Sequence, residues 1–521
     1  MDEATTRALA VAAELDRALA DPADERNPAS FPAAVAADRE GRFPRRLCAA
    51  ALAWGLAEYL IPAASGGRLS TLEEAFALFR VLARRDLTAA TTIAASFLSA
   101  LPVWLDGSRA QRRAVAGLLR EHELMGLPIG AAEPGVDILA REIAAFGDRH
   151  AWRLDGRTSL IDNGSHAAAT TVLARTGQGP TAFLLLRGGG EHWWFQPARE
   201  THGLRGGALS RLTLAGAPAG DAQVVGRLGQ GLALAGRTLP VARLLVAALT
   251  LGGLDTCLRS VLPRVPVEPE PVARRLVDAY TDLLIGEAVC HELCRTARLD
   301  PHGFAGASAR VCPPVARLAG DAVESLAGLL GGDGYCAGIV EKMRRDVAVA
   351  GALADDHLPR AEDDLPPDPF VRIPPELAWL ERPPAGEDSG PAWLGGPSAA
   401  EGTAGSVGGG LEAAAEVVRA DGLPGPHAPR LLELLEWFAA RRPGSWPAEA
   451  AAACAAAWLR ARGRDGYHMC GGWLLLCLRR LAILAGHEQP EDAGVRRVAL
   501  VRLRRAGEQR RLFSDHDVEL A

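Results

Sequence analysis

Two short motifs combine residue types that bind metals in proteins. Cys290, His291 and Cys294 have the chemistry of a zinc site, and His468 with Cys470 forms a weaker version of the same pattern. Neither motif is followed by a second pair of ligands at zinc-like spacing, and the first lies in an apparent helix. We therefore interpret both as structural residues and predict no metal.

Two charged residues have the chemistry of proton transfer or covalent catalysis. Asp162 directly precedes Asn163-Gly164, where an aspartate often accepts a local hydrogen bond within a turn. Lys342 is the only lysine of the chain, and it stands in the charged run EKMRRD. Any Schiff-base chemistry would have to use this one amine.

The stretch from Ala151 to Thr176 contains Asp162 and is predicted to form three short strands. Asp155-Gly156 and Asn163-Gly164 supply the positive φ angles that tight hairpins need. Apolar residues at helical spacing occupy residues 48–60 and 71–85, and helical patterns return after residue 231. A helical block, a compact β segment and a second helical block indicate an α+β fold.

Composition limits the classes of partner. The chain has 521 residues, of which 48% are hydrophobic and 23% charged, and its net charge of -6 argues against nucleic acid. Nine cysteines without regular spacing and an acidic, helical start favour a reducing cytoplasm. The longest apolar runs, residues 239–254 and 473–485, contain Arg243 and Arg479-Arg480, so no membrane span is predicted.

Several motifs resemble the acyl-CoA dehydrogenase family. Trp152, Leu154 and Gly156 match the Trp-x-Leu-x-Gly signature that opens the family's middle β domain. Further matches follow in the family's order: Gly203-Leu204-Arg205, Leu212-Thr213-Leu214, Gly229-Gln230-Gly231, Gly331-Gly332-Asp333-Gly334-Tyr335 and Arg345-Asp346. At the start, Gly107-Ser108 precedes a helix expected near Arg109, with Ser108 as its N-cap.

The resemblance implies the family's three domains and covers about the first 356 residues. We expect an N-terminal helical domain, a middle β domain that is barrel-like and a helical-bundle domain, followed by a Pro/Gly-rich linker and an appended C-terminal helical domain. The expected bounds are 1–127, 128–228, 229–356, 357–410 and 411–521.

The resemblance also implies an acyl thioester ligand, attached to CoA or to a carrier protein, and an FAD cofactor. The positions that would hold a retained flavin are Glu133, Gly135, Leu160, Asp162, Gly331 and Gly332. Alanine replaces the family's flavin-binding threonine before Glu133, and Leu160-Ile161-Asp162-Asn163 replaces Trp-Ile-Thr-Asn. An aspartate there would oppose the negative charge of a reduced flavin, so FAD is disfavoured.

The family's two positions for a catalytic glutamate coincide with Ala354 and Ala242. Neither alanine can accept a proton. The remaining candidates are Asp162, in the former flavin cleft, Arg243, which the resemblance places beside the thioester pocket, and Asp355, next to one lost base position. Ordinary α,β-dehydrogenation is therefore disfavoured.

Three hypotheses follow. The first is an atypical enzyme of specialised metabolism that acts on an acyl thioester without flavin. Its reaction would be a cyclisation, an isomerisation or an elimination. The second is a non-catalytic partner of an intact dehydrogenase subunit, and the third is an FAD-dependent dehydrogenase with relocated contacts. The resemblance implies a homodimer or a heteromer, in which the appended helices would cover the site, seal the dimer or admit a carrier protein.

Overall fold

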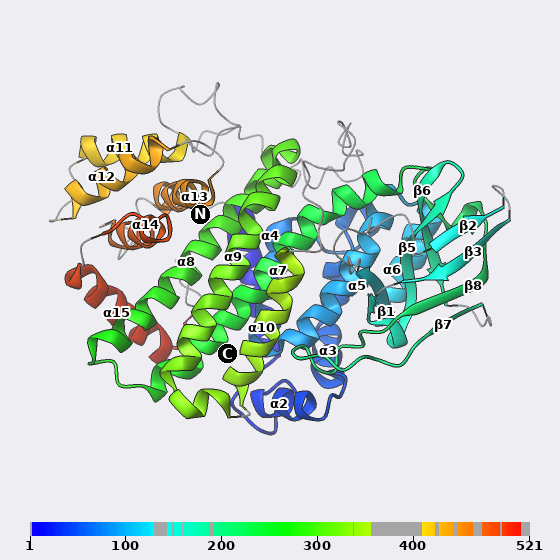
Figure 1. Ribbon diagram of the computed structural model, residues 1–521, viewed down its shortest axis with the longest axis horizontal. Coiled ribbons are helices and arrows are strands. Elements are labelled where there is room, and N and C mark those ends of the chain that lie inside the picture. The colour runs from blue at the N-terminus through cyan, green and yellow to red at the C-terminus, as the bar shows by residue number, and fades with distance from the viewer. Residues whose placement is uncertain are drawn as a thin grey trace.

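The structure is a computed structural model, which describes most of the chain. The described residues are 3–129, 143–147, 151–158, 160–187, 192–336, 338–355, 409–421, 427–441, 445–461, 471–489 and 492–511. Most of the predicted linker, and the motif His468-x-Cys470, lie outside these ranges. Figure 1 shows the sheet at one end of the molecule, the long helices in the middle and the appended helices at the other end.

Six helices precede the sheet. They are α1 (Glu3–Ala18), α2 (Phe31–Arg39), α3 (Arg45–Trp54), α4 (Leu72–Arg85), α5 (Leu87–Asp106) and α6 (Arg109–Arg120). Ser108 is the N-cap of α6, as predicted, and its hydroxyl forms a capping box with Gln111. The N-cap of α5 is Asp86, whose carboxylate accepts a hydrogen bond of 2.9 Å from the backbone N–H of Thr88.

The middle region is a nine-stranded sheet. Its strands are β1 (Leu124–Ile129), β2 (Ile143–Phe146), β3 (Trp152–Arg157), β4 (Leu160–Asp162), β5 (Ala167–Thr176), β6 (Gly179–Leu186), β7 (Trp193–Phe195), β8 (Leu212–Ala219) and β9 (Val224–Val225). The order is β4-β1-β5-β2-β3-β8-β7, and β6 pairs with β5 and β9. A buried cluster around Trp152, Leu154 and Phe183 fills its core.

One of the two predicted turns is wrong. Asp155-Gly156 lies inside β3, where the register with β8 shifts between Leu154 and Gly156. Gly156 has φ +134°, so the dipeptide forms an irregularity within a continuous strand rather than a hairpin. The other turn is confirmed, because β4 ends at Asp162 and Asn163 has φ +58° before β5. It is not a hairpin, since β4 and β5 each pair with β1 rather than with each other.

Four long helices form the bundle in the middle of the molecule (Figure 1). They are α7 (Gly231–Val261), α8 (Glu270–Leu299), α9 (Pro301–Leu329) and α10 (Ile339–Asp355). The helix α7 begins at Gly231, as the Gly229-x-Gly231 motif predicted, and it packs against α4, α5, α9 and α10. One hydrophobic core therefore joins this bundle to the N-terminal helices.

Lys342, the single lysine, links α10 to the N-terminal domain through ion pairs. Lys342 Nζ donates to Asp86 Oδ1 at 2.8 Å and to Asp346, both of which are buried. Asp346 in turn accepts a hydrogen bond of 2.6 Å from the backbone N–H of Leu204. These carboxylates raise the pKa of Lys342 against the opposing effect of burial. A firmly charged amine is unsuited to Schiff-base chemistry, so Lys342 is a structural residue.

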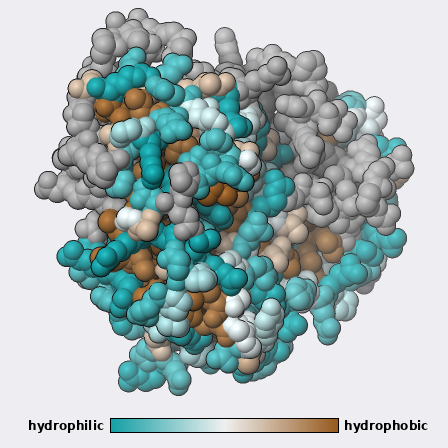
Figure 2. Space-filling model, turned by 60° about the vertical axis from the view of Figure 1, so that its left-hand side comes forward, coloured by the Kyte–Doolittle hydropathy of each residue, from teal (hydrophilic) through white to brown (hydrophobic). Residues whose placement is uncertain are grey.

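Five further helices form the appended domain. They are α11 (Gly409–Asp421), α12 (Ala428–Ala439), α13 (Trp446–Ala461), α14 (Gly472–Leu484) and α15 (Ala493–Glu508). The domain docks on α8, where Arg480 of α14 makes two hydrogen bonds of 2.8 Å to the buried Asp282 carboxylate. Figure 2 brings this side forward and shows a mainly hydrophilic surface with hydrophobic patches.

Two helices are long and apolar enough to span a membrane by length and composition. These segments are Leu87–Asp106 and Gly231–Arg264, and 83% and 89% of their apolar windows are buried inside the protein. Such burial is typical of core helices, and the cytoplasmic location stays a prediction. The eight cysteines that the structure describes are all free thiols.

Candidate functional site

A cavity of about 280 Å³ lies between α5, α7 and the sheet. Most of its walls are apolar, and α10 closes one side with Ala350. The lining residues from α5 recur on one helix face: Thr91, Ala94, Ala95, Leu98, Ser99 and Pro102. Because most of these side chains are small, space remains between α5 and α7. The cavity is near the lower end of the size range of ligand pockets.

The hydroxyl groups of the lining are engaged within the protein. Ser99 Oγ donates to the carbonyl of Gly126 at 2.7 Å, and Thr171 Oγ1 donates to the carbonyl of Ser99 at 2.8 Å. Thr91 and Thr238 likewise donate to carbonyls of their own helices. These groups join the helices to the strands and are not oriented toward a ligand as donors.

Asp162 is the only titratable residue in the described lining of the cavity. It ends β4, is 7% exposed, and accepts a hydrogen bond of 2.9 Å on Oδ1 from the backbone N–H of Asn163. Burial raises the pKa of Asp162 to about 6, and the Asn163 hydrogen bond acts weakly in the opposite direction. A carboxyl group with this pKa is present in both protonation states near neutral pH.

Asn163 fixes the turn that carries Asp162. It is fully buried, with φ +58°, a conformation that asparagine tolerates better than most residues. Its Nδ2 donates to the carbonyls of Thr92 at 2.7 Å and Met125 at 3.1 Å. The turn is thereby held against both α5 and β1, so the Asp162 carboxylate has a defined position at the cavity.

The structure separates the predicted catalytic residues. Ala242 lines the cavity beside Leu245 and Val246 of α7, whereas Arg243 is not among the described lining residues. Arg243 is buried toward α9, where burial lowers its pKa and Cys312 partly offsets that effect. Asp355 is the last residue of α10 and follows Ala354. Of the two candidates whose side chains the structure describes, Asp162 and Arg243, Asp162 lines the cavity.

The predicted flavin-binding positions are also dispersed. Leu160 pairs with Ile129 but is not among the described lining residues. Gly331 and Gly332 lie in an exposed 3-10 turn after α9. Glu133 and Gly135 lie outside the described residues. No group of three or more metal-ligating side chains occurs among the residues that the structure describes, and Cys290 and Cys294 are core residues.

The described part of the lining is a poor fit for a redox-active flavin. It contains no cation, and its one charged group is the Asp162 carboxylate. A flavin ring gains negative charge when it is reduced, and a carboxylate in a poorly screened cavity opposes that charge. An uncharged acyl chain fits the same apolar walls without this conflict.

Sequence reasoning missed the part of the site that α5 provides. Thr91, Ala95 and Ser99 recur at intervals of four residues and place small side chains along one helix face. That repeat was the available signal. It was hidden because small residues also occur on the other faces of this alanine-rich helix.

The arrangement of helices around this sheet and cavity defines the acyl-CoA dehydrogenase fold. Residues 16–121 match the family described as acyl-CoA dehydrogenase, N-terminal domain. The mitochondrial isovaleryl-CoA dehydrogenases of Arabidopsis thaliana and Solanum tuberosum are 25% and 24% identical over 250 residues, which cover 44% of this chain. The chain matches 59% of the length of each of these relatives.

Solved structures extend the similarity of fold. An acyl-CoA dehydrogenase complexed with FAD from Bacillus anthracis has a TM-score of 0.67 at 15% identity and covers 98% of this chain and 96% of its own. The prolyl acyl carrier protein oxidase AnaB has a TM-score of 0.59 at 16% identity and covers 67% of this chain and 94% of its own. These similarities show that the chain has the acyl-CoA dehydrogenase fold, and the family-model match covers residues 16–121. The first of these similarities also extends over the appended helices, beyond the 356 residues of the predicted resemblance.

Proposed function

We propose that this protein binds an acyl thioester, carried by CoA or by a carrier protein, and acts on it without flavin. Asp162 serves as the acid/base group, and the reaction is an isomerisation, an elimination or a cyclisation. The observation that carries the proposal is the Asp162 carboxyl group, with a pKa of about 6, which is the one titratable group in the mainly apolar lining that the structure describes.

The pKa of Asp162 suits proton transfer near neutral pH. General acid/base catalysis works best when the pKa of the group is close to the operating pH. In the isomerisation of a β,γ-unsaturated acyl thioester, the Asp162 carboxylate takes the proton from the carbon next to the thioester carbonyl, and the electron pair of that bond moves into a dienolate. The protonated carboxyl then returns the proton to the γ-carbon, so the double bond shifts to the α,β position and no oxidant is consumed.

The residues on the helical wall of the cavity favour such a flavin-independent reaction over ordinary dehydrogenation. Dehydrogenation needs a base across the acyl chain from the flavin. Ala242 of α7 and Ala350 of α10 stand on that helical wall, and neither side chain can accept a proton. Asp162 is instead contributed by β4, on the sheet side of the cavity.

The test is the visible absorption spectrum of the purified protein, combined with product analysis on a panel of acyl thioesters. A colourless protein that converts a thioester supports the proposal, and the Asp162→Asn variant should lose about 10² to 10⁴ of the rate. Glu412→Gln makes the same kind of change at an exposed carboxylate of α11, outside the described lining, and serves as the control. Conversion that is equal in Asp162→Asn and the wild type would refute the role of Asp162.

A second candidate is an FAD-dependent oxidoreductase that acts on an acyl thioester through relocated contacts. The similarity to a dehydrogenase complexed with FAD, which spans 98% of this chain, favours it. A flavin absorption band at nearly one equivalent would establish this alternative. Copurification with an intact dehydrogenase, as a heteromer without activity of its own, would instead identify a partner subunit.

A further inference from the structure

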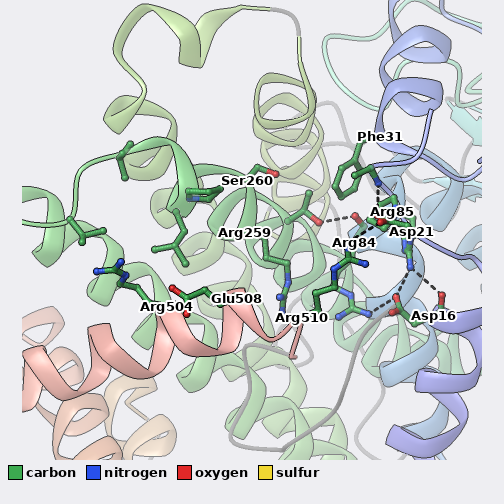
Figure 3. A pocket seen from close by; sticks show the side chains of 18 of the residues that line it. Asp16, Asp21, Phe31, Arg84, Arg85, Arg259, Ser260, Arg504, Glu508 and Arg510 are labelled. Carbon is green, nitrogen blue, oxygen red and sulfur yellow. Dashed lines mark hydrogen bonds and ion pairs between the residues drawn. The ribbon is translucent and has the colours of Figure 1, made fainter. Parts of the chain in front are cut away.

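A second cavity, of about 700 Å³, lies where α15 passes the ends of α4 and α7. Its walls also include α1, the loop after α1 and the proline-rich loop from Leu262 to Glu268. It shares no described lining residue with the cavity that contains Asp162. Figure 3 shows this second cavity, with labelled side chains from the N-terminal region, α4, α7 and the region of α15.

Arginines are the most frequent charged residues of the second cavity. Five of them line it: Arg84 and Arg85 from α4, Arg259 from α7, Arg504 from α15 and Arg510 just after α15. Four carboxylates share the lining, of which Glu268 and Glu508 are exposed at the rim. The buried residues Arg84, Arg85 and Asp16 form the inner end of the cavity, and the fourth carboxylate, Asp21, pairs with Arg510 at 3.1 Å.

At this inner end, one carboxylate accepts hydrogen bonds from two guanidinium groups. Asp16 Oδ1 accepts from Arg84 Nη2 at 2.9 Å and from Arg85 Nη2 at 3.0 Å. Arg84 is only 5% exposed, and its other terminal nitrogen, Nη1, is buried without an acceptor in the described part of the chain. A buried donor of this kind is costly unless a ligand or water satisfies it.

Ion pairs behind the cavity, including one between Arg80 and Glu287, balance the charges of Arg80 and Arg259 but leave Arg84 Nη1 without an acceptor in the described part of the chain. Arg259 pairs with Asp255 at 2.6 Å, and Asp255 also pairs with Arg80 at 3.4 Å. Burial lowers the pKa of Arg259, the Asp255 carboxylate opposes this effect, and the neighbouring charges of Arg84 and Arg80 add to it. Like charges held this closely favour the binding of an anion between them.

Part of the cavity wall is apolar. Phe31 and Pro22 from the N-terminal region face the cavity together with Leu262, Pro263 and Val265. The cavity volume is within the range of ligand pockets. This pairing of arginines with an apolar and aromatic wall fits a molecule that has an anionic end and an organic body.

We propose that the second cavity binds an organic phosphate with the chemistry of a nucleotide. Its phosphates lie against Arg84, Arg85 and Arg259, and its organic body lies against Phe31 and the proline-rich loop. Arg504 and Arg510 close the site from α15. Binding therefore ties the appended domain to the N-terminal helices, and it does not depend on the reaction proposed for the first cavity.

The test is calorimetric titration of the full chain with ADP, adenosine and inorganic pyrophosphate. We expect saturable binding of ADP, much weaker binding of pyrophosphate and none of adenosine. Because a charge-assisted hydrogen bond is lost and a repulsive charge is added, Arg504→Glu should weaken ADP binding by about tenfold to 100-fold. The matched control is Arg113→Glu, an exposed arginine of α6 that lines neither cavity.

Three results would overturn the proposal: absence of ADP binding, equal binding to the wild type and to Arg504→Glu, or an equal loss in both charge-reversal variants. Arg84→Gln probes the inner end, but it disturbs a buried ion pair and can prevent folding. Arg504 is exposed, so its variant keeps the test decisive.

Discussion

Asn163 Nδ2 donates a hydrogen bond of 2.7 Å to the backbone carbonyl of Thr92, which lies within α5. This bond joins the turn after β4 to the helix that forms the facing wall of the first cavity. Asp162 immediately precedes Asn163 in that turn, so the same contact fixes the carboxylate that we propose as the acid/base group.

Substitutions of Asn163 test this brace. Asn163→Gly tolerates φ +58° but loses the side-chain hydrogen bonds, and we expect it to destabilise the protein by about 1 to 3 kcal/mol. Asn163→Ala also strains the backbone, because alanine disfavours the left-handed conformation. We expect it to lower the free energy of unfolding by about 1 to 2 kcal/mol more than Asn163→Gly does. Urea unfolding curves measure both. An alanine variant as stable as the wild type would show that the brace contributes nothing.

The raised pKa of Asp162 predicts a pH-dependent stability. Since the pKa rises from 3.8 in the unfolded chain to about 6 in the folded protein, folding favours the protonated form. The stability contributed by this group is complete below pH 4 and is lost as the pH rises through 6. Asp162→Asn removes the titration.

We therefore expect the stability of Asp162→Asn, relative to the wild type, to increase by about 3 kcal/mol between pH 4 and pH 8. Unfolding curves of both proteins across this pH range provide the measurement. A stability difference that stays constant with pH would mean that the Asp162 carboxyl group has an ordinary pKa.

Filling the first cavity should prevent ligand binding without unfolding the protein. Ala242→Leu places a larger apolar side chain in a space of about 280 Å³. We expect thioester affinity to fall by more than about tenfold, while overpacking costs at most about 1 to 3 kcal/mol. Ala233→Leu is the control, because Ala233 is also on α7 but does not line the cavity. Unchanged thioester affinity in Ala242→Leu would place the ligand elsewhere.

The ion pair between Arg480 and Asp282 should be important for docking of the appended domain. Arg480→Ala leaves the Asp282 carboxylate, 1% exposed, without its guanidinium partner, and we expect a loss of about 3 to 5 kcal/mol. Arg419→Ala removes a half-exposed pair with Glu436 and should cost at most about 1 kcal/mol. Thermal unfolding distinguishes the two variants. Equal effects would show that the buried pair has no special role.

Local signals in the sequence were sufficient for the parts of the fold that depend on short-range contacts. Ser108 was identifiable as an N-cap, because its hydroxyl bonds three residues ahead within the same helix. Asn163-Gly164 was identifiable as a turn, because asparagine supplies the positive φ itself. Asp162 was identifiable as a cavity residue only because that turn was combined with the family resemblance.

Long-range contacts account for what the sequence did not predict. The pairing of β3 with β8, more than 50 residues away, converts Asp155-Gly156 from a turn into an irregularity within a strand. The helix α7 is buried around most of its circumference, so periodicity could not show that Arg243 faces away from the cavity. The second cavity gathers arginines from α4, α7 and α15, and no local pattern links them.

The central claim is most directly tested by following the exchange of the protons next to the thioester carbonyl in D₂O by NMR. The flavin-free wild type should exchange these protons in at least one acyl thioester, and Asp162→Asn should do so about 10² to 10⁴ times more slowly. Exchange at the same rate in both proteins, or exchange that requires added FAD, would contradict the account.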